Sequence, residues 1–164
     1  QQFVTDTYWG TLDALLVDMP PGTGDATLSL LEFLPDTTLL AVTTPQTTAR
    51  LVAARVARMA AETGVPLAGV IENMTAAVCR SCGEQTSVFG TGGGALLAEE
   101  AGAPLLGQVP LDVELREAGD RGVPVVVDAP ESASARELTR IATVLPAPQR
   151  KLAGRALPLS VVAR

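Results

Sequence analysis

Two short stretches of the sequence carry side chains that could do chemistry. The first is 17-VDMPPGTGD-25, in which Asp18 follows an apolar run and Gly22 follows two prolines. A carboxylate at a strand end can hold Mg²⁺ through water, and a nearby glycine can offer its backbone N–H to a phosphate. The alternative is a plain turn in which Thr23 or Asp25 caps the next helix. Local composition leaves both interpretations open.

The second stretch is a C-x-x-C pair made of Cys79 and Cys82, which are the two cysteines of the chain. Two thiolates cannot complete a four-coordinate site, but a symmetric dimer would supply four, which suits a [4Fe–4S] cluster or zinc. A redox pair is the third possibility. Such a pair usually begins a helix, and Gly83 directly after Cys82 disfavours a helix here. The spacing alone leaves the three uses open.

Strands and helices alternate along the chain. The apolar patterns predict strands over 11–17, 37–43, 66–72 and 104–109, and helices over 24–34, 46–64, 95–102, 112–122 and 131–145. This alternation is typical of βαβ units, and continuous apolar runs suit strands that are covered on both faces. We therefore predict an α/β fold with a doubly wound, mostly parallel sheet. Ligands of such sheets bind beyond the carboxyl ends of the strands, where the predicted loops begin after Val17, Thr43, Glu72 and Val109.

The connecting segments carry expectations of their own. Residues 74–89, which include the cysteine pair, are expected to be irregular, and residues 124–127 to be extended. The glycine run 90–94 is expected to form a turn that places the next helix beside the cysteines. Asp112 is the expected cap of the helix over 112–122.

The helix expected over 46–64 should bury an apolar face and end at Gly64. The residues expected on its buried face are Leu51, Val52, Val56 and Met59. Its arginines, Arg50, Arg55 and Arg58, are expected to form a solvated face.

Composition excludes several classes of protein. The chain has 164 residues, a net charge of −6 and no histidine, so a histidine base and histidine metal ligands are excluded. The acidic balance argues against nucleic-acid binding, and no apolar run approaches the roughly 20 residues of a membrane span. One tight cysteine pair cannot staple a domain of this size, so we expect a reduced, cytoplasmic protein that binds neither nucleic acid nor membrane.

Several stretches, taken in order, resemble the Mrp/ApbC-type iron–sulfur cluster carrier ATPases, which belong to the deviant Walker, MinD/ParA-like P-loop superfamily. They are DMPPGTGD at 18–25, VTTPQ at 42–46, GVIENM at 69–74, C-x-x-C-G at 79–83, VFGTGGG at 88–94 and GQVPLD at 107–112. The resemblance covers residues 1 to about 145, and it implies part of a SIMIBI-type P-loop NTPase domain. Residues 146–164 are expected to be a disordered tail.

The resemblance implies a nucleotide site that binds and hydrolyses ATP with Mg²⁺. Asp18 matches the acid that orients Mg²⁺ and water, and Gly22 matches the switch-loop glycine near the γ-phosphate. Asn73 matches an asparagine that contacts adenine. Pro110 and Asp112 lie in the segment that lines the base pocket.

The resemblance also implies a cargo site. Cys79 and Cys82 match the pair that binds a [4Fe–4S] cluster bridging the two subunits of a homodimer, and the cluster passes to apo iron–sulfur proteins. Two alternatives remain, which are a MinD/ParA-like positioning ATPase and a zinc-stabilised dimer module without catalysis.

One part of the family's site is missing from this sequence. The family's P-loop needs a lysine that neutralises phosphate, and Lys151 is the single lysine of the chain. The sequence therefore looks like a carboxyl-terminal portion that lacks the P-loop. We expect such a chain not to hydrolyse ATP alone, and to show low stability because a central strand is missing.

Overall fold

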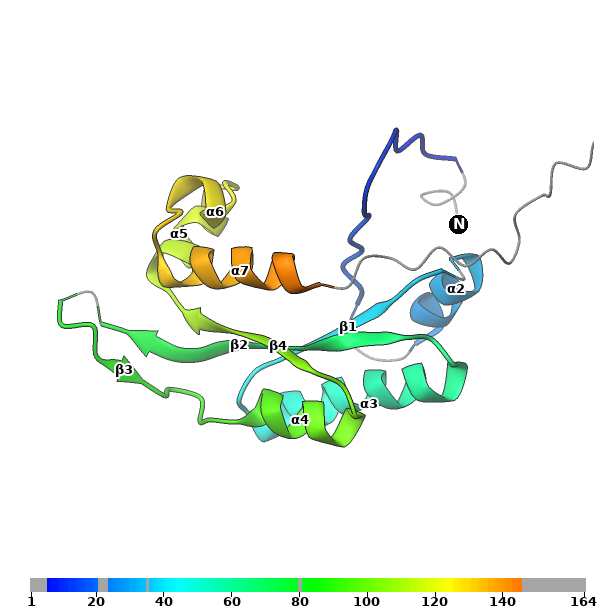
Figure 1. Ribbon diagram of the computed structural model, residues 1–164, viewed down its shortest axis with the longest axis horizontal. Helices are drawn as coiled ribbons and strands as arrows, with labels where there is room; N and C mark the ends of the chain where they lie inside the picture. Colours follow the sequence, from blue (N-terminus) through cyan, green and yellow to red (C-terminus); the bar gives the residue numbers. More distant parts are fainter. Residues whose placement is uncertain (1–5, 21–23, 35, 80, 146–164) are drawn as a thin grey trace, which may run out of the picture.

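The computed structural model describes residues 6–20, 24–34, 36–79 and 81–145. They form three layers, with a sheet between two layers of helices (Figure 1). The strands are β1 (Leu39–Thr43), β2 (Leu67–Val78), β3 (Gln85–Thr86) and β4 (Leu105–Leu111). The helices are α2 (Asp25–Phe33), α3 (Thr47–Thr63), α4 (Gly93–Ala101), α5 (Val113–Asp120), α6 (Val125–Asp128) and α7 (Ala133–Val144).

The sheet is mostly parallel, as the sequence predicts. β2 lies at its centre, with β1 and β4 parallel to it on either side. β3 pairs antiparallel with the far end of β2, on the side away from β4, because Ala77 has Thr86 and Leu111 as its two partners. The connections β1–α3–β2 and β2–α4–β4 are βαβ crossovers, and they set the carboxyl ends of three strands at one edge of the sheet.

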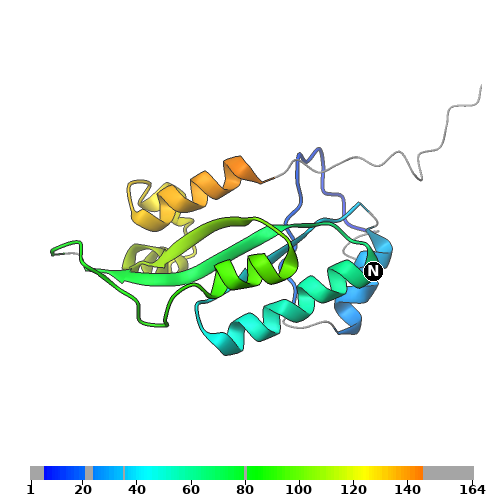
Figure 2. The same cartoon turned by 60° about the horizontal axis from the view of Figure 1, so that its bottom comes forward.

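Helices cover both faces of the sheet. α3 and α4 lie side by side on one face, and α5, α6 and α7 lie on the other (Figures 1 and 2). One apolar cluster, under α3 and α4, contains Ala41, Ala53, Val70, Leu97 and Ala98. A second cluster, under α7, contains Ile71, Leu106, Val109 and Ile141. Successive residues of β2 thus point to opposite layers, which explains its continuous apolar run.

The buried face of α3 differs from the predicted one. The helix buries Ala53, Met59 and Ala60, whereas Leu51 is 53% exposed and Val52 is 43% exposed. Small alanines let the helix approach the sheet and α4 closely, so the larger apolar residues are left on the rim. Gly64 adopts the left-handed conformation (φ 69°) and ends the helix as predicted.

The arginines of α3 do not all share one environment. Arg55 and Arg58 are exposed, as predicted for a solvated face. Arg50 is different, because it forms an ion pair with Glu100 of α4 and thereby joins the two helices.

Three other expectations about local structure are wrong. Residues 11–17 form no strand, and Leu16 is 85% exposed. A strand needs a ladder partner, and no described strand pairs with this segment. Residues 124–127 are not extended, because Val125 begins the short helix α6 after Pro124. β2 continues through Val78 into the stretch expected to be irregular.

The described residues contain no helix that is both long enough and apolar enough to cross a bilayer.

Candidate functional site

The cysteine pair lies at the tip of an arm that projects beyond the carboxyl edge of the sheet (Figures 1 and 2). We define the cysteine arm as residues 74–92, which run out along β2 and return along β3 to α4. Its ladder pairs Ala77 with Thr86 and Val78 with Gln85. The outgoing leg also pairs with β4 through Ala77 and Leu111, so β4 and the root of the arm together set its direction.

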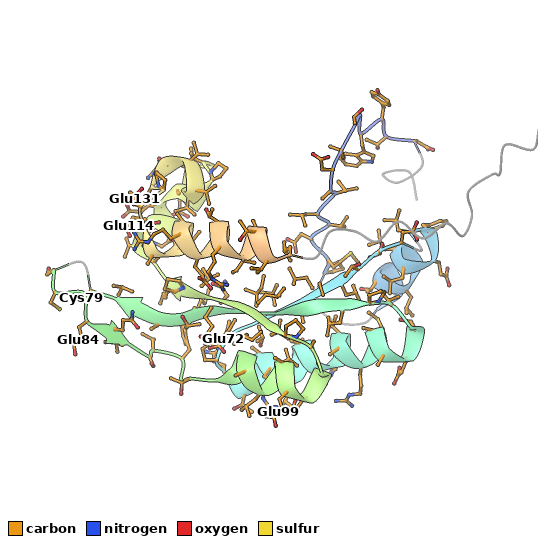
Figure 3. The ribbon with its side chains drawn as sticks, viewed as in Figure 1. Glu72, Cys79, Glu84, Glu99, Glu114 and Glu131 are labelled. Atoms are coloured by element: carbon orange, nitrogen blue, oxygen red, sulfur yellow. The ribbon has the colours of Figure 1, made fainter. Side chains whose placement is uncertain are left out.

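A tight turn closes the tip of the arm. The N–H of Cys79 donates to the carbonyl of Glu84 at 2.9 Å, and the N–H of Gly83 donates to the carbonyl of Cys79 at 2.8 Å. Gly83 has φ +73°, a conformation that glycine adopts without strain. Both cysteines are free thiols and both are exposed, and Figure 3 shows Cys79 and Glu84 at this end of the molecule. The turn is not a helix start, so the geometry does not match a helix-borne redox pair.

The backbone of the turn favours the thiolate form of Cys79. The N–H of Cys82 donates to the Cys79 sulfur, the N–H of Ser81 does the same, and together they hold the pKa of the Cys79 thiol below its ordinary value. Thiolate is the form that ligates metals. Among the described residues, no three His, Cys, Asp or Glu side chains gather into a metal site. In the described part of the chain, the two thiols therefore lie without a third such ligand close enough to complete a metal site.

Asn73 lies where β2 enters the arm, and β4 runs beside it. It pairs with Val109 in the ladder, and its Oδ1 accepts the N–H of Met74 at 2.9 Å. Met74 has φ 59°, and the ladder register shifts between Asn73 and Ala77. The shift is a bulge, and such bulges redirect strands and are common beside functional sites. The hydrogen bond fixes the amide of Asn73 with its oxygen toward Met74.

Asp112 is engaged by two helices. Its Oδ1 accepts the N–H of Glu114 at 3.0 Å, which caps α5 as predicted. Its Oδ2 accepts the N–H of Ser134 at 3.1 Å and the hydroxyl of Ser134 at 2.8 Å, which ties the first turn of α7 to the end of β4. Burial raises the pKa of Asp112, but these hydrogen bonds outweigh that effect and leave the pKa below its ordinary value. The carboxylate thus holds the 110–112 segment in place.

Pro110 lies near the end of β4 and is half-buried. The structure therefore gathers Asn73, Pro110 and Asp112 at the carboxyl edge of neighbouring strands, and the cysteine arm leaves from the same edge.

Asp18 is not gathered there. It lies in the irregular segment 6–20, its side chain is exposed, and Figures 1 and 2 place this segment toward α2 rather than toward the arm. Gly22 lies outside the described residues, as does Thr23. The N-cap of α2 is Gly24, so neither Thr23 nor Asp25 holds that position. The described residues alone thus do not assemble the acid with the residues expected around the base.

The glycine run 90–94 does more than form a turn. A Cβ atom on Gly93 would lie 2.7 Å from the carbonyl oxygen of Pro45, and one on Gly94 would lie 2.6 Å from Oε2 of Glu72. A methyl group at Gly93 would displace the backbone at Pro45, and one at Gly94 would displace the side chain of Glu72. The run therefore seats α4 directly against the ends of β1 and β2.

Sequence reasoning did not assign a role to Glu72. This residue is 1% exposed at the centre of the sheet, and its Oε2 accepts the N–H of Gly94 at 2.5 Å. A charged residue that ends the apolar run 66-PLAGVIE-72 was the available signal, because buried carboxylates are rare without a partner.

The fold and the arm define a class of protein. A mostly parallel sheet covered by helices on both faces, with loops that leave from the carboxyl ends of its strands, is the architecture of α/β nucleotide-binding proteins. The family model described as NUBPL iron-transfer P-loop NTPase, within ParA, matches residues 1–145, and the chain belongs to this family. The family resemblance stated from the sequence is thereby confirmed.

The curated relatives are substantially longer than this chain. The iron–sulfur cluster carrier protein of Mycobacterium tuberculosis is 47% identical over 170 residues, which cover 100% of this chain and 44% of the relative. The iron–sulfur cluster carrier protein of Synechocystis is 49% identical over 143 residues, which cover 87% of this chain and 40% of the relative. The chain thus spans less than half the length of these relatives.

Solved structures share the fold. A nucleotide-binding protein of Archaeoglobus fulgidus in complex with ADP is 34% identical, with a TM-score of 0.63, over 76% of this chain and 50% of that protein. The septum site-determining protein MinD of Pyrococcus horikoshii, complexed with Mg-ADP, is 23% identical, with a TM-score of 0.58, over 76% of this chain and 46% of that protein. At that identity the MinD likeness concerns the fold alone.

Proposed function

We propose that the protein acts as an iron–sulfur cluster carrier, with Cys79 and Cys82 as the cargo ligands. The observation that carries the proposal is the exposed cysteine arm of a chain that belongs to an iron-transfer family. A carrier must bind its cluster tightly enough to transport it, and the cluster must be accessible enough to be released to an acceptor. Two exposed thiols at the tip of a projecting arm meet both needs, because an acceptor can approach them without crossing the protein.

The ligand count supports a shared cargo site. Each chain contributes two cysteines, and no third ligand of the metal-binding types lies close to them among the described residues. A homodimer with arms facing each other across a two-fold axis supplies four thiolates, the ligand set of a [4Fe–4S] cluster. The lowered pKa of Cys79 favours this use, since metal ligation requires deprotonated thiols.

Transfer to an apo-protein then proceeds by ligand exchange. Each incoming thiol of the acceptor bonds to iron as a thiolate, and its proton goes to the departing Cys79 or Cys82 sulfur. No net oxidation is needed. Thiol access decides the rate, and the exposed tip provides it.

ATP is proposed as the regulator of this cycle. In the assembled site, Asn73 would contact the adenine, and Pro110 would line its pocket. Asp112 would hold that segment in shape by capping α5 and by accepting the N–H and the hydroxyl of Ser134 in the first turn of α7. Asp18 and Gly22 would serve Mg²⁺ and the γ-phosphate when a phosphate-binding loop lies beside them. Hydrolysis is proposed only for a protein in which such a loop joins these residues.

Anaerobic reconstitution with ferrous iron and sulfide tests the cargo assignment. We expect a broad absorption near ~400 nm, typical of thiolate-ligated clusters, and about two iron atoms per chain in a dimeric species. The matched control is the Cys79→Ser/Cys82→Ser variant, which keeps the fold and should lose the band. Uptake of one zinc per dimer without the band would instead establish the zinc module.

A further inference from the structure

Glu72 is a buried acid that the proposed cargo and nucleotide chemistry leave unused. It lies in the ladder between Thr43 of β1 and Gln108 of β4, with 1% of its surface exposed. Because successive residues of β2 point to opposite layers, Glu72 points to the α4 side of the sheet, and Asn73 points to the α7 side. Figure 3 shows Glu72 between the sheet and the layer of α3 and α4.

The carboxylate of Glu72 meets the first turn of α4. Its Oε2 accepts the N–H of Gly94 at 2.5 Å. The first N–H groups of a helix lack partners within the helix, and they attract negative charge. The contact is also sterically close, since a Cβ atom on Gly94 would lie 2.6 Å from both Cβ and Oε2 of Glu72.

This contact joins the two legs of the cysteine arm at their root. The outgoing leg begins at Met74, two residues after Glu72, where Asn73 and Met74 form the bulge. The returning leg ends at Gly92, the N-cap of α4, two residues before Gly94. Among the described residues between the two positions, the two legs pair with each other at two positions, and Ala77 of the outgoing leg also pairs with Leu111 of β4.

We infer that Glu72 is the positioning residue of the cysteine arm: its hydrogen bond to Gly94 clamps the root and sets the direction of Cys79 and Cys82. The inference rests on the proposed carrier function for its biological meaning. The hydrogen bond between Glu72 and Gly94 itself forms in the chain without a bound cluster. Glu72 is also the sequence neighbour of Asn73, the proposed adenine contact. The clamp therefore connects the proposed nucleotide site with the cysteine arm.

Two glycine variants form a matched pair for the test. Gly94→Ala adds a methyl group that collides with Glu72, whereas Gly119→Ala in α5 adds one into open space. Both changes raise helix propensity by a similar amount. Hydrogen exchange of the purified protein, without iron, then reports amide protection across residues 74–92. We expect about tenfold faster exchange of the arm in Gly94→Ala, and wild-type exchange in Gly119→Ala.

Substitutions at Glu72 test the clamp from its other side. Glu72→Ala removes the acceptor and should speed exchange of the arm as Gly94→Ala does. Glu72→Gln retains an acceptor for the Gly94 N–H and should keep the exchange within about threefold of wild type. Ile141→Ala, on the opposite face of the sheet, controls for general destabilisation and should leave the arm protected relative to the rest of the protein.

The two proposals fail separately. Arm exchange at the wild-type rate in both Gly94→Ala and Glu72→Ala overturns the clamp, as does equal acceleration in Ile141→Ala. When the reconstituted wild type shows the cluster band, the clamp further predicts an altered visible circular dichroism spectrum in Glu72→Ala and a preserved one in Glu72→Gln. Absence of the band in wild type counts against the carrier function, and the exchange data still decide the clamp.

Discussion

Glu137 of α7 accepts the backbone N–H of Gln108 on β4, with 2.8 Å between its Oε1 and the nitrogen. Arg140, one turn later, donates to the carbonyl of Leu106 at 2.6 Å and to the same Oε1 of Glu137 at 2.7 Å. β4 pairs with β2 alone among the described strands. The two side chains therefore supply an acceptor and a donor to backbone groups of β4, as a neighbouring strand would, and cover an edge that could otherwise recruit another chain.

Removal of the Glu137 carboxylate should destabilise the protein. Glu137→Ala leaves the N–H of Gln108 without its partner, and we expect a loss of about 1–3 kcal/mol in the free energy of unfolding at neutral pH. Urea denaturation measures this loss. Glu131→Ala is the matched control, because the side chain of Glu131 is 93% exposed, and it should leave the stability unchanged.

The effect of Glu137 should depend on pH in one direction. The hydrogen bond from Arg140 lowers the pKa of Glu137, helped by the N–H of Gln108 and against the effect of burial. A carboxyl whose pKa is lower when folded contributes stability above its unfolded pKa and loses it as pH falls through its folded pKa. The difference between wild type and Glu137→Ala should therefore shrink as the solution is acidified below about pH 4. A constant difference would refute the ion pair as its source.

Gly107 makes the approach of α7 to β4 possible, so its replacement should be costly. A Cβ atom there would lie 2.4 Å from Cγ1 and 2.5 Å from Cδ1 of Ile141. We expect Gly107→Ala to lower the free energy of unfolding by about 1–3 kcal/mol through overpacking. Ile141→Ala removes both atoms, so the double variant should be more stable than the sum of the two single losses predicts. Strict additivity would show that the contact is not the cause.

The sequence predicted the parallel α/β fold because its helices and internal strands carry strong local patterns. It misassigned 11–17 because an apolar run specifies a strand only when a ladder partner is present. The buried face of α3 was missed for another reason. A hydrophobic pattern assigns the large apolar side chains to the buried face. This helix instead packs through Ala53 and Ala60, and leaves Leu51 and Val52 exposed.

The candidate site was predictable where a motif marks it and not where packing creates it. The cysteine pair and the cap at Asp112 follow from residue types and spacing. The second bond of Asp112, to Ser134, joins residues 22 positions apart and depends on the way α7 returns to β4. The clamp between Glu72 and Gly94 is equally non-local, and no local propensity encodes it.

Asp112 should contribute more to stability than an ordinary helix cap. Asp112→Ala removes acceptors from α5 and α7 together, and we expect a loss of about 2–4 kcal/mol, judged from about 1 kcal/mol per cap with further loss for unsatisfied donors. Ser132→Ala removes the N-cap of α7, whose hydroxyl accepts the N–H of Ala135 and lies 3.3 Å from the Ser134 hydroxyl, and it is the single-cap control. Chemical denaturation compares the two. Equal losses would mean that Asp112 holds one helix only.

Cys79 should react with electrophiles at lower pH in the folded protein than in the unfolded chain. The N–H of Cys82 lowers the pKa of the Cys79 thiol, and unfolding removes this bond. Cys82→Ser keeps the backbone donor and leaves Cys79 as the single thiol. The rate of its alkylation by iodoacetamide, followed by mass spectrometry across pH 6–10, should rise at lower pH without urea than in urea. Identical profiles would show that the turn does not stabilise the thiolate.

The apolar segment 12–17 should promote self-association of the purified chain. Leu16 is 85% exposed, its neighbours Leu15 and Val17 are each 45% exposed, and β1 offers an outer edge with no strand partner in the described part of the chain. Exposed apolar runs beside an open strand edge favour aggregation. Sedimentation velocity over a concentration series should therefore show larger species, and Leu16→Gln should reduce them.

Leu16→Gln also tests whether segment 12–17 packs against the folded protein. Because Leu16 is mostly exposed, Leu16→Gln removes little buried apolar surface. The substitution should therefore leave the thermal midpoint unchanged. Leu97→Ala, at a position of α4 with 0% exposure, should lower the free energy of unfolding by about 2–5 kcal/mol without reducing association. A monodisperse wild type, or a Leu16→Gln variant that melts much earlier than wild type, would show that 12–17 packs against the protein in solution. The segment would then be part of the fold, and Asp18 at its end would be held in a fixed place.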